Sequence, residues 1–467
     1  MKTMMRASLV GVLMAGAATS ALAQTADERI AALEAKIAAL TGELADIKAV
    51  TAKTETERKK SATTALSNGR PTISTGDGQK FAVRGLAQFD AASYDEKRGA
   101  NDLNSGTNFR RARIGVEGTF AKDWNYAVMG EFGGSGVESP TLIQAYVEYA
   151  GWKPGGIPVR LRAGGWATPT GLEDATSNTE GAFIERPAVA EMVRGIAGAD
   201  ARSGFGAFAN GERWYASAVL TGAIAGASGP DFDEQVGYLT RVAISPVGGD
   251  DWALHLGANH QGVLKVADTG AGALRTREIR LRERPELRVD ATRLVDTGAI
   301  RATGVNVYGA ELGAYYRNVQ VAAEAFRIDV DRTGAANPSF DGWYVQGTWV
   351  LTGEHRAWSS QSGGFKGVKP KKNFNPAEGA WGAVEIAGRY SVLDLDDGAG
   401  LAGRATPTGG IRGGEQTIMT AGLSWYPNPV VRFQLQYQNV DVDRLNAAGF
   451  EVGDDADIIS VRSQFAF

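Results

Sequence analysis

The chain has 467 residues, of which 43% are hydrophobic and 22% charged, and its formal net charge is -4. A negative balance excludes a general nucleic-acid-binding surface, so any basic function must be local. The absence of cysteine excludes disulfides and thiolate sites. Only His255, His260 and His355 remain for acid–base or metal chemistry, and none lies in a recognisable catalytic motif. We therefore predict neither an enzyme nor a protein that needs a cofactor or metal.

Residues 1–23 have the pattern of a secretory signal peptide. Lys2 and Arg6 precede a short apolar run, and Ala21-Leu22-Ala23 offers a small-x-small cleavage site. The alternative is an uncleaved anchor helix. No later segment approaches the roughly 20 apolar residues of a membrane helix. If the mature protein spans a membrane, it must do so as a closed barrel.

Residues 24–50 predict a short coiled-coil helix. Apolar residues recur with spacings of 3, 4, 3, 4 and 3, at Ile30, Leu33, Ile37, Leu40, Leu44 and Ile47. Mixed Ile and Leu in this seam fits a trimer at least as well as a dimer. The alternative is an amphipathic helix packed on its own domain. The polar segment that follows, residues 51–79, is predicted to be a linker.

From Phe81 onward the hydrophobic period changes to two. In the stretch VRFQLQYQNV, Val431 and Phe433 lie on one side while Arg432 and Gln434 lie on the other. Many such stretches are separated by connections that alternate between tight turns, as at 317–318, and long polar loops at 94–106, 166–203, 267–303 and 396–415. This alternation is typical of outer-membrane barrels. We predict an all-β fold over residues 80–467, a 16-stranded antiparallel transmembrane β-barrel that ends on Phe467.

The same alternation assigns charges to the lumen. In NFRRARIGVEGTF, Ile114 and Phe120 face outward, so Arg111, Arg113 and Glu117 point inward, and Arg84 falls on the polar side of the first strand. A charge on the lipid face costs about 2–4 kcal/mol at the bilayer midplane, which makes this sidedness well determined. The alternative is that these arginines merely pair with acids of the wall.

The loop 267–303 contains an arginine row. In TREIRLRERPELR, residues 276–288, alternate positions carry Arg280, Arg282, Arg284 and Arg288, while Ile279, Leu281 and Leu287 are apolar. Same-face residues of an extended chain lie about 7 Å apart, so such a row can pass an anion from one guanidinium to the next. An apolar opposite edge lets the loop pack against the barrel interior. A solvated, salt-bridged surface loop remains an equal alternative.

A second basic cluster, residues 355–377, contains no acid and lies on the periplasmic side by strand count. Its lysines are Lys366, Lys369, Lys371 and Lys372. We interpret them as an electrostatic exit pool for anions. The alternatives are a solvated turn and a contact with anionic cell-wall polymers.

Several motifs of the second part of the chain resemble the phosphate-selective porin O and P family. They are FRRARIGVEG, FIERP, GWYVQGTWVLTGE, GAWGAVEIAGRYS, TAGLSWYPN and VVRFQLQY. The resemblance implies a homotrimer of 16-stranded barrels in the Gram-negative outer membrane. It also implies an arginine ladder, which Arg111, Arg113, Arg280, Arg282, Arg284 and Arg288 resemble here, and a lysine exit pool, which Lys366, Lys369, Lys371 and Lys372 resemble.

The third long loop departs from the family. The family's phosphate site uses a lysine and serine hydroxyls there, whereas no lysine occurs between Lys153 and Lys265. Arg186 is among the basic residues of this loop, and Thr176, Ser177 and Thr179 offer hydroxyls. An anion preference is compatible with this composition, while high phosphate selectivity is put in question.

The leading hypothesis is therefore a passive outer-membrane channel for phosphate or related small anions, with its coiled coil in the periplasm. The alternative is a general porin whose barrel anchors a coiled-coil tether to peptidoglycan. Expected partners are small anions, outer-membrane lipid and two further copies of the chain.

Overall fold

The computed structural model describes residues 25–67, 69–99, 101–134, 141–198, 201–225, 232–270 and 272–467. The signal peptide predicted for residues 1–23 lies outside these ranges. The chain divides into two units, one holding the N-terminal helix and the other the β-structure. Among the described residues, no helix combines the length and apolar character that crossing a membrane requires.

Helix α1 spans Ala26–Lys60. It begins where the Thr25 N–H donates to the Glu28 carboxylate, 2.9 Å away, and Asp27 and Glu28 favour the helix dipole. The apolar heptad residues are all exposed, from 53% at Leu44 to 62% at Ile37. The helix is longer than the predicted coiled coil because the strong helix formers that follow residue 50 extend it after the apolar seam has ended.

The predicted linker, residues 51–79, also contains a β-hairpin. Strands β1 (Ala62–Ser67) and β2 (Arg70–Thr75) pair with each other, and β2 pairs with the first barrel strand. Threonine and isoleucine in ATTALS and RPTIST favour extended backbone, a signal that the polar composition concealed.

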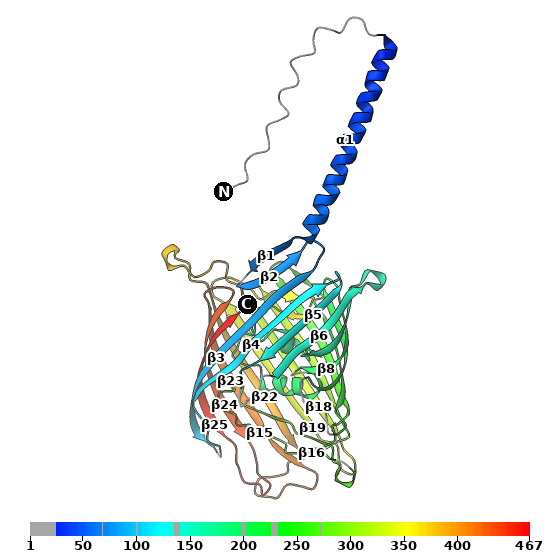
Figure 1. The fold of residues 1–467 in the computed structure, drawn as a ribbon. Helices are drawn as coiled ribbons and strands as arrows, with labels where there is room; N and C mark the ends of the chain where they lie inside the picture. Colours follow the sequence, from blue (N-terminus) through cyan, green and yellow to red (C-terminus); the bar gives the residue numbers. More distant parts are fainter. Residues whose placement is uncertain are drawn as a thin grey trace. The chain divides into compact units, whose positions relative to one another are not determined.

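Sixteen antiparallel strands form the wall of a closed barrel among the described residues (Figure 1). The large sheet has 19 strands, of which β1, β2 and β11 (Gly248–Gly249) are short additions. The wall strands are β3 (Lys80–Arg98), β4 (Gly106–Phe120), β5 (Trp124–Glu131), β6 (Thr141–Trp152), β7 (Val159–Trp166), β8 (Arg202–Asn210), β9 (Trp214–Ile224), β10 (Val236–Ile244), β12 (Trp252–Lys265), β17 (Gly304–Tyr316), β18 (Val319–Asp331), β19 (Ser339–Val350), β22 (Ala383–Asp397), β23 (Ile411–Tyr426), β24 (Val431–Asp443) and β25 (Asp455–Ala466).

The barrel closes where β25 pairs with β3 from Leu86 to Arg98, with one register shift between Asp455 and Ala456. Phe467 completes the seam, because its N–H and carbonyl exchange two 3.0 Å hydrogen bonds with Gly85. A Cβ at Gly85 would lie 2.4 Å from the Phe467 ring, so a larger residue here would require the ring to move. The predicted 16-stranded antiparallel barrel is confirmed.

The connections fall into two sets at opposite rims. We call the rim where β3 begins and β25 ends the terminal rim, and the opposite one the loop rim. Loops L3, L5, L6, L7 and L8 follow β7, β12, β18, β22 and β24 at the loop rim, and the long turn joins β19 to β22 at the terminal rim. The connections contain further short elements. The turn between β6 and β7 holds η1 (Pro154–Gly156). The loops and the long turn hold α2 (Leu172–Ala175), α3 (Ala188–Ala197), η2 (Gly272–Leu274), β13 (Glu278–Ile279), β14 (Arg282–Glu283), β15 (Val295–Asp296), β16 (Ile300–Arg301), β20 (Trp358–Ser359), β21 (Gly364–Phe365) and η3 (Pro376–Glu378).

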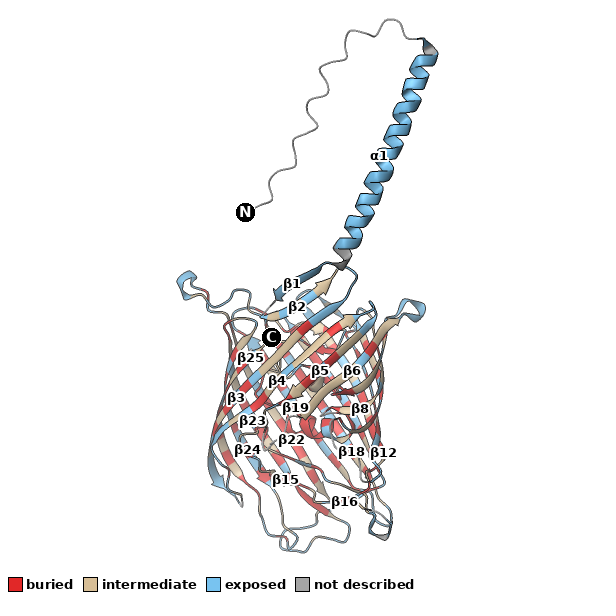
Figure 2. Ribbon diagram, viewed as in Figure 1, coloured by how far each residue is buried: buried red, intermediate tan, exposed pale blue. Residues whose placement is uncertain are grey.

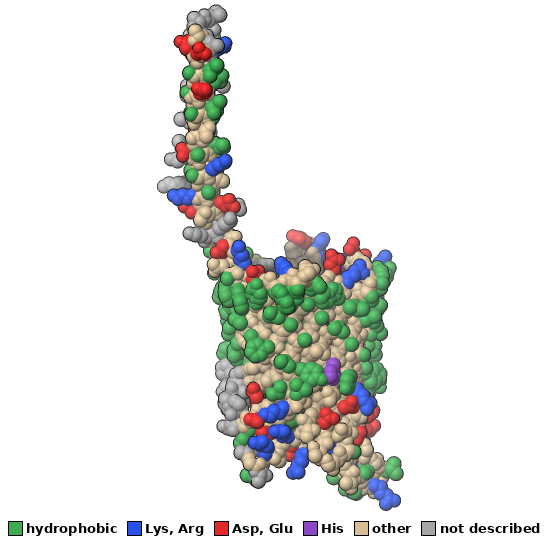
Figure 3. Space-filling view, turned by 90° about the vertical axis from the view of Figure 1, so that its right-hand side faces the viewer, with side chains coloured by type: hydrophobic (Ala, Val, Ile, Leu, Met, Phe, Trp, Pro, Cys, Tyr) green, Lys and Arg blue, Asp and Glu red, His purple; other side chains and the backbone are tan. Residues whose placement is uncertain are grey.

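Side chains alternate between the two faces of the wall as the period of two predicts (Figure 2). Their chemistry changes along each strand, as β18 shows. Near the terminal rim, Val321 faces outward and Gln320 inward; near the loop rim, Asp329 faces outward and the buried Ile328 inward. The apolar outer belt therefore occupies the part of the wall nearer the terminal rim, and charges cover the outside nearer the loops (Figure 3).

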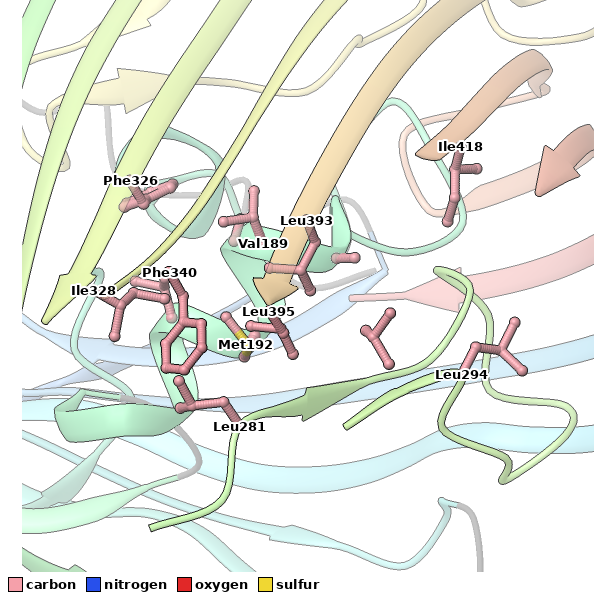
Figure 4. Close-up of a cluster of buried hydrophobic side chains, with 14 of the residues drawn as sticks. Val189, Met192, Leu281, Leu294, Phe326, Ile328, Phe340, Leu393, Leu395 and Ile418 are labelled. Carbon is pink, nitrogen blue, oxygen red and sulfur yellow. The ribbon is translucent and has the colours of Figure 1, made fainter. Parts of the chain in front are cut away.

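The largest apolar core lies inside the barrel, toward the loop rim. It joins lumen-facing wall residues such as Phe326, Ile328 and Phe340 to Val189 of α3 and Leu281 of L5 (Figure 4). In this half the lumen is lined by apolar residues because two loops fold inward and need an apolar surface to pack on.

Candidate functional site

Loop L3 crosses the lumen and is held there by both apolar and polar contacts. Val189 and Val193 of α3 are fully buried against the wall. Ahead of α3 in the chain, the loop's backbone carbonyls accept hydrogen bonds from wall side chains: Gly181 from Arg432 at 2.6 Å, and Ala182 from Gln434 at 3.2 Å. Buried carbonyls need such donors, so the polar row on the inner face of β24 serves to fix the loop.

Loop L5 also folds inward. Leu281 and Leu287 are 4% and 1% exposed and belong to the core inside the barrel. The row itself is broken. Glu286 has a φ of 53° and turns to the wall, where its carboxylate lies 3.0 Å from Arg389. The sequence Arg-Pro-Glu interrupts the alternation, since the turn reverses the direction in which the side chains point.

The long turn enters the lumen from the terminal rim. Arg241 of β10 donates to the carbonyls of Ser362 and Gly363 at 2.8 and 2.6 Å, and it also pairs with Glu311. Arg356 of the turn pairs with Glu385 of β22 and donates to the Glu180 carbonyl of L3. Loop L3 and the long turn therefore meet inside the barrel, a contact that the sequence did not predict.

Inside the barrel, L3 places Glu185 in a buried cluster of arginines, which we call the constriction. The Glu185 carboxylate lies 2.8 Å from Arg110, 3.4 Å from Arg111 and 2.7 Å from Arg462. Burial opposes ionisation of Glu185, but the three guanidiniums outweigh it and hold its pKa well below the usual range. A space of only about 20 Å³ remains between Arg111, Glu185 and Arg186. That is room for roughly one water molecule.

Toward the terminal rim the lumen widens into a cavity of about 570 Å³. We call it the cationic cavity, because its described lining has eight cationic residues and only two acidic ones, Asp174 and Glu180. The cationic residues are Arg70, Lys80, Arg84, Arg113, Arg186, Arg194, Lys369 and Arg432. The polar side chains of Thr176, Ser177, Asn178 and Thr179 also line it.

Five of these cations lie within ion-pair distance of three carboxylates. Arg70 and Arg84 share Glu117, Arg113 pairs with Glu131, and Arg186 and Arg194 share Asp174. Lys80, Lys369 and Arg432 have no such carboxylate among the described residues. Arg432 donates instead to Gly181 and Gln464. The cavity thus keeps an excess of positive charge.

The predicted arginines of L5 lie on the other side of the constriction. Arg280, Arg282 and Arg288 line a second cavity, of about 330 Å³, between L5, α3 and the loop-rim ends of β12 and β17. Arg280 pairs with Asp296 and Arg288 with Glu191 of α3. Arg282 is exposed and has no ion pair in the described part of the chain.

Arg284 differs from its neighbours in the row. Its Nε and one Nη are buried without a hydrogen-bond partner among the described residues. Burial, followed by the nearby charges of Arg293 and Arg288, lowers its pKa to about 10. An arginine whose donors are buried and unused, and which has other cations beside it, is a favourable place for an anion.

Of the four predicted lysines, one lines the cationic cavity and three lie outside its lining. Lys369 lines the cationic cavity. Lys371 donates to the Gly353 carbonyl at 2.7 Å, and Lys366 and Lys372 are exposed on the long turn. Only one of the four therefore reaches the lumen cavity.

Some lumen residues were not chosen from the sequence. Arg110 points inward beside Arg111 because a β-bulge interrupts the pairing of β3 with β4 after Gln88, and strict alternation had placed it outside. Arg389, Arg432 and Arg462 lie on the polar side of their strands, so their sidedness was predictable. What they bind was not, because their partners come from L3 and L5.

The family model described as phosphate-selective porin O and P matches residues 81–467. The chain belongs to this family. Porin O of Pseudomonas aeruginosa is 27% identical over 412 residues, which cover 83% of this chain and 88% of the relative. An uncharacterised protein of Caulobacter vibrioides is 28% identical over 392 residues, or 80% of this chain and 71% of the relative. The chain is therefore an outer-membrane porin, as its sequence motifs predicted.

Solved porin structures are similar at low identity. OmpT of Vibrio cholerae, in its trimer form, is 12% identical, covers 84% of this chain and 100% of its own, and gives a TM-score of 0.47. An anion-selective porin from Comamonas acidovorans is also 12% identical, with 83% and 100% of the chains covered and a TM-score of 0.47.

Proposed function

We propose that this porin forms a water-filled, anion-selective channel through which phosphate or related small anions cross the outer membrane passively. The observation that carries the proposal is the cationic cavity, with eight cationic and two acidic residues in its described lining. A low-dielectric wall around an excess of one charge raises the local concentration of counter-ions and repels ions of the same sign.

The proposed path runs from the L5 cavity through the constriction to the cationic cavity. Arg280, Arg282 and Arg288 receive the anion, and Arg284 binds it with its unused donors. Arg111 and Arg186 line the narrow space, and Arg84, Arg113 and Lys369 lie in the wider cavity beyond. Guanidinium groups match phosphate with two parallel hydrogen bonds and keep their charge at neutral pH.

In this scheme, a permeating anion exchanges with the Glu185 carboxylate as the partner of the arginines in the constriction. Where Arg110, Arg111 and Arg462 surround Glu185, an anion passes by taking the place of the carboxylate beside one of these guanidiniums. The Thr176, Ser177 and Thr179 hydroxyls, at the edge of the cationic cavity, replace part of the lost hydration. Lys366, Lys371 and Lys372 surround the exit as exposed charges and act at longer range.

Planar bilayers with purified porin test the proposal. We expect the reversal potential in a KCl gradient to report chloride over potassium permeability, and added phosphate to reduce the chloride current. The R284Q variant should show weaker phosphate block, whereas R317Q, an exposed arginine in a tight turn at the terminal rim, should behave as the unaltered protein. A preference for potassium over chloride would overturn the proposal.

Helix α1 supports a second role for the N-terminal unit. Its exposed heptad residues have no partner within the described chain, and three copies of the helix would bury them in a parallel coiled coil. We propose a homotrimer with this coiled coil in the periplasm, where it either stabilises the trimer or tethers the barrel to peptidoglycan. Deletion of residues 26–60 separates tethering from conduction: envelope defects with normal anion current favour the tether.

A further inference from the structure

A buried histidine joins the long turn, residues 351–382, to the barrel wall. His255 of β12 is 0% exposed. On one side of its ring, Nδ1 lies 3.0 Å from the indole Nε1 of Trp358 in the long turn. On the other side, Nε2 lies 3.0 Å from a carboxylate oxygen of Glu311 on β17. The imidazole therefore connects the turn to a charged group of the wall.

These two partners allow one tautomer of His255. An indole N–H donates and cannot accept, so Nδ1 is the acceptor of the Trp358 hydrogen bond and carries no proton. A carboxylate accepts, so Nε2 carries the proton of the ring and donates it to Glu311. The contact with Trp358 exists only while the imidazole is neutral, because an imidazolium has an N–H at both positions.

The other charged groups near His255 lie on the strands beside it. Arg241 of β10 pairs with Glu311 at 2.7 Å. Glu324 of β18 lies directly opposite Glu311 in the sheet, and its carboxylate accepts two backbone N–H groups of α2. Among the described residues, Trp358 is the one hydrogen-bond partner of His255 Nδ1. A proton added there has no acceptor while the turn is docked.

The indole of Trp358 also fixes the surroundings of the turn. It packs on an apolar cluster that contains Phe365 of the turn, Tyr315 of β17 and Leu172 of L3. Phe365 lies beside His255 as well, with ring centroids 5.9 Å apart. A movement of Trp358 therefore loosens the contact between the long turn and L3 inside the barrel.

Protonation of His255 at Nδ1 and docking of the turn exclude each other. The imidazolium keeps its hydrogen bond to Glu311, but at Nδ1 it presents an N–H to the N–H of Trp358, so that hydrogen bond is lost. The docked turn thus binds this proton less tightly than the released turn does, and acid shifts the equilibrium toward release. Imidazole is the side chain that gains its charge between about pH 8 and about pH 5.

We propose that His255 is a positioning residue that makes the width of the lumen depend on pH. At neutral pH, the neutral ring holds Trp358 and keeps the long turn inside the barrel. In acid, the added proton on Nδ1 releases Trp358, the turn withdraws toward the terminal rim, and the lumen widens. The inference goes beyond the proposed anion selectivity, since it concerns the width of the porin and holds whichever ion the channel prefers.

Single-channel recordings of the purified porin in planar bilayers, at about pH 7.5 and about pH 5.5, test the inference. We expect a wider conductance level whose occupancy rises about tenfold at the lower pH, because one hydrogen bond is lost. W358F lacks the indole donor and should occupy the wider level at both pH values. H255Q should occupy the narrower level at both, because the amide offers one acceptor and one donor group and gains no proton.

The other two histidines of the chain provide controls. His260 stacks on Tyr308 on the outer face, with ring centroids 4.7 Å apart, and His355 of the long turn stacks on Tyr315 at 5.6 Å. H260Q and H355Q should respond to pH as the unaltered porin does. E324Q tests the neighbouring carboxyl group and should respond in the same way. The heat-induced mobility shift on gels checks that each variant is folded.

A pH response that persists in H255Q, or that E324Q abolishes, overturns the inference. So does an unchanged occupancy of the wider level at the two pH values in the unaltered protein. If H255Q does not fold, hydrogen exchange of the backbone of residues 356–366 replaces it: W358F should exchange faster than the unaltered porin at the higher pH, and equal exchange overturns the inference. A preference for potassium over chloride contradicts the proposed anion channel alone, since reversal potentials and conductance levels are separate measurements.

Discussion

At the scale of single residues, Glu185 and Arg284 differ in how far their charges are compensated by neighbouring groups. Glu185 is one carboxylate shared by Arg110, Arg111 and Arg462, while Arg284 is a half-buried guanidinium with unused donors. Selectivity at a narrow point depends on which charge remains uncompensated there. These two side chains are therefore the most informative ones to change.

We expect E185Q to increase anion selectivity. Loss of the carboxylate leaves three arginines of the constriction without their shared counter-ion, so a permeating anion becomes their best partner. Reversal potentials in a KCl gradient should shift further toward chloride, by a several-fold rise in the permeability ratio. The isosteric glutamine keeps hydrogen-bonding capacity, so resistance to heat on gels serves as the check on folding. A shift toward potassium would contradict this role for Glu185.

The lowered pKa of Arg284 predicts that phosphate block of the chloride current depends on pH. Its pKa of about 10 means that it is charged below that pH and neutral above it, whereas an ordinary arginine stays charged past pH 12. Phosphate block of the chloride current should therefore weaken as the pH rises through about 10. The decisive measurement is the difference in block between the unaltered porin and R284Q. That difference should vanish above pH 11, and a constant difference would refute the assignment.

At the scale of elements, the channel depends on loops that are held by the interior of the barrel. Leu281 and Leu287 anchor L5 in the core. Each buried leucine contributes about 2–3 kcal/mol when removed from water, so L281S/L287S should release L5. We expect a larger single-channel conductance and weaker phosphate block. L274S, an exposed leucine of the same loop, is the control and should change neither.

The heptad pattern of helix α1 predicts that the helix associates with copies of itself. A peptide of residues 25–60 should form a helical trimer in solution, and I37S/L40S should leave it monomeric and largely unfolded, because short isolated helices need a partner for their apolar face. Sedimentation equilibrium and circular dichroism report both properties. A monomeric but fully helical native peptide would rule out the coiled coil.

The sequence predicted the elements better than their mutual contacts. Alternation in β18 or β24 repeats every two residues, so strand number, sidedness and the inward direction of Arg111 and Arg113 could be derived. The placement of Glu185 against Arg462, or of the long turn against Arg241, depends on residues far apart in the chain. The bulge at Arg110 and the turn at Glu286 were missed for a local reason, since each breaks the period on which the prediction relied.

At the scale of the whole molecule, the outer surface near the loop rim carries a row of like charges. Asp341, Asp394, Glu415 and Asp443 lie directly opposite one another on four adjacent strands. At the two ends of the row, Arg327 lies 4.0 Å from Asp341 and Arg98 lies 3.5 Å from Asp443. Asp394 and Glu415 have no cation within that distance among the described residues. A row of this kind cannot sit in hydrocarbon, so it marks where the wall leaves the apolar belt.

We expect D394N to stabilise the barrel, because like charges directly opposite each other in a sheet cost up to about 1 kcal/mol. The heat-induced mobility shift on gels should move to higher temperature. D443N is the control. It removes the attraction between Asp443 and Arg98 as well as the repulsion between Asp443 and Glu415, so it should change the heat stability little. Lower stability of D394N would show that the row is held by interactions other than repulsion.

The seam between β3 and β25 has a consequence for the timing of folding. The wall closes between the first and the last of its sixteen strands, and Gly85 must meet Phe467 without any side chain between them. Until β25 has been made, β3 presents an open edge that lipid cannot satisfy. The barrel therefore cannot be finished while its chain is still being synthesised, and a chain cut short before β25 has no way to complete its wall.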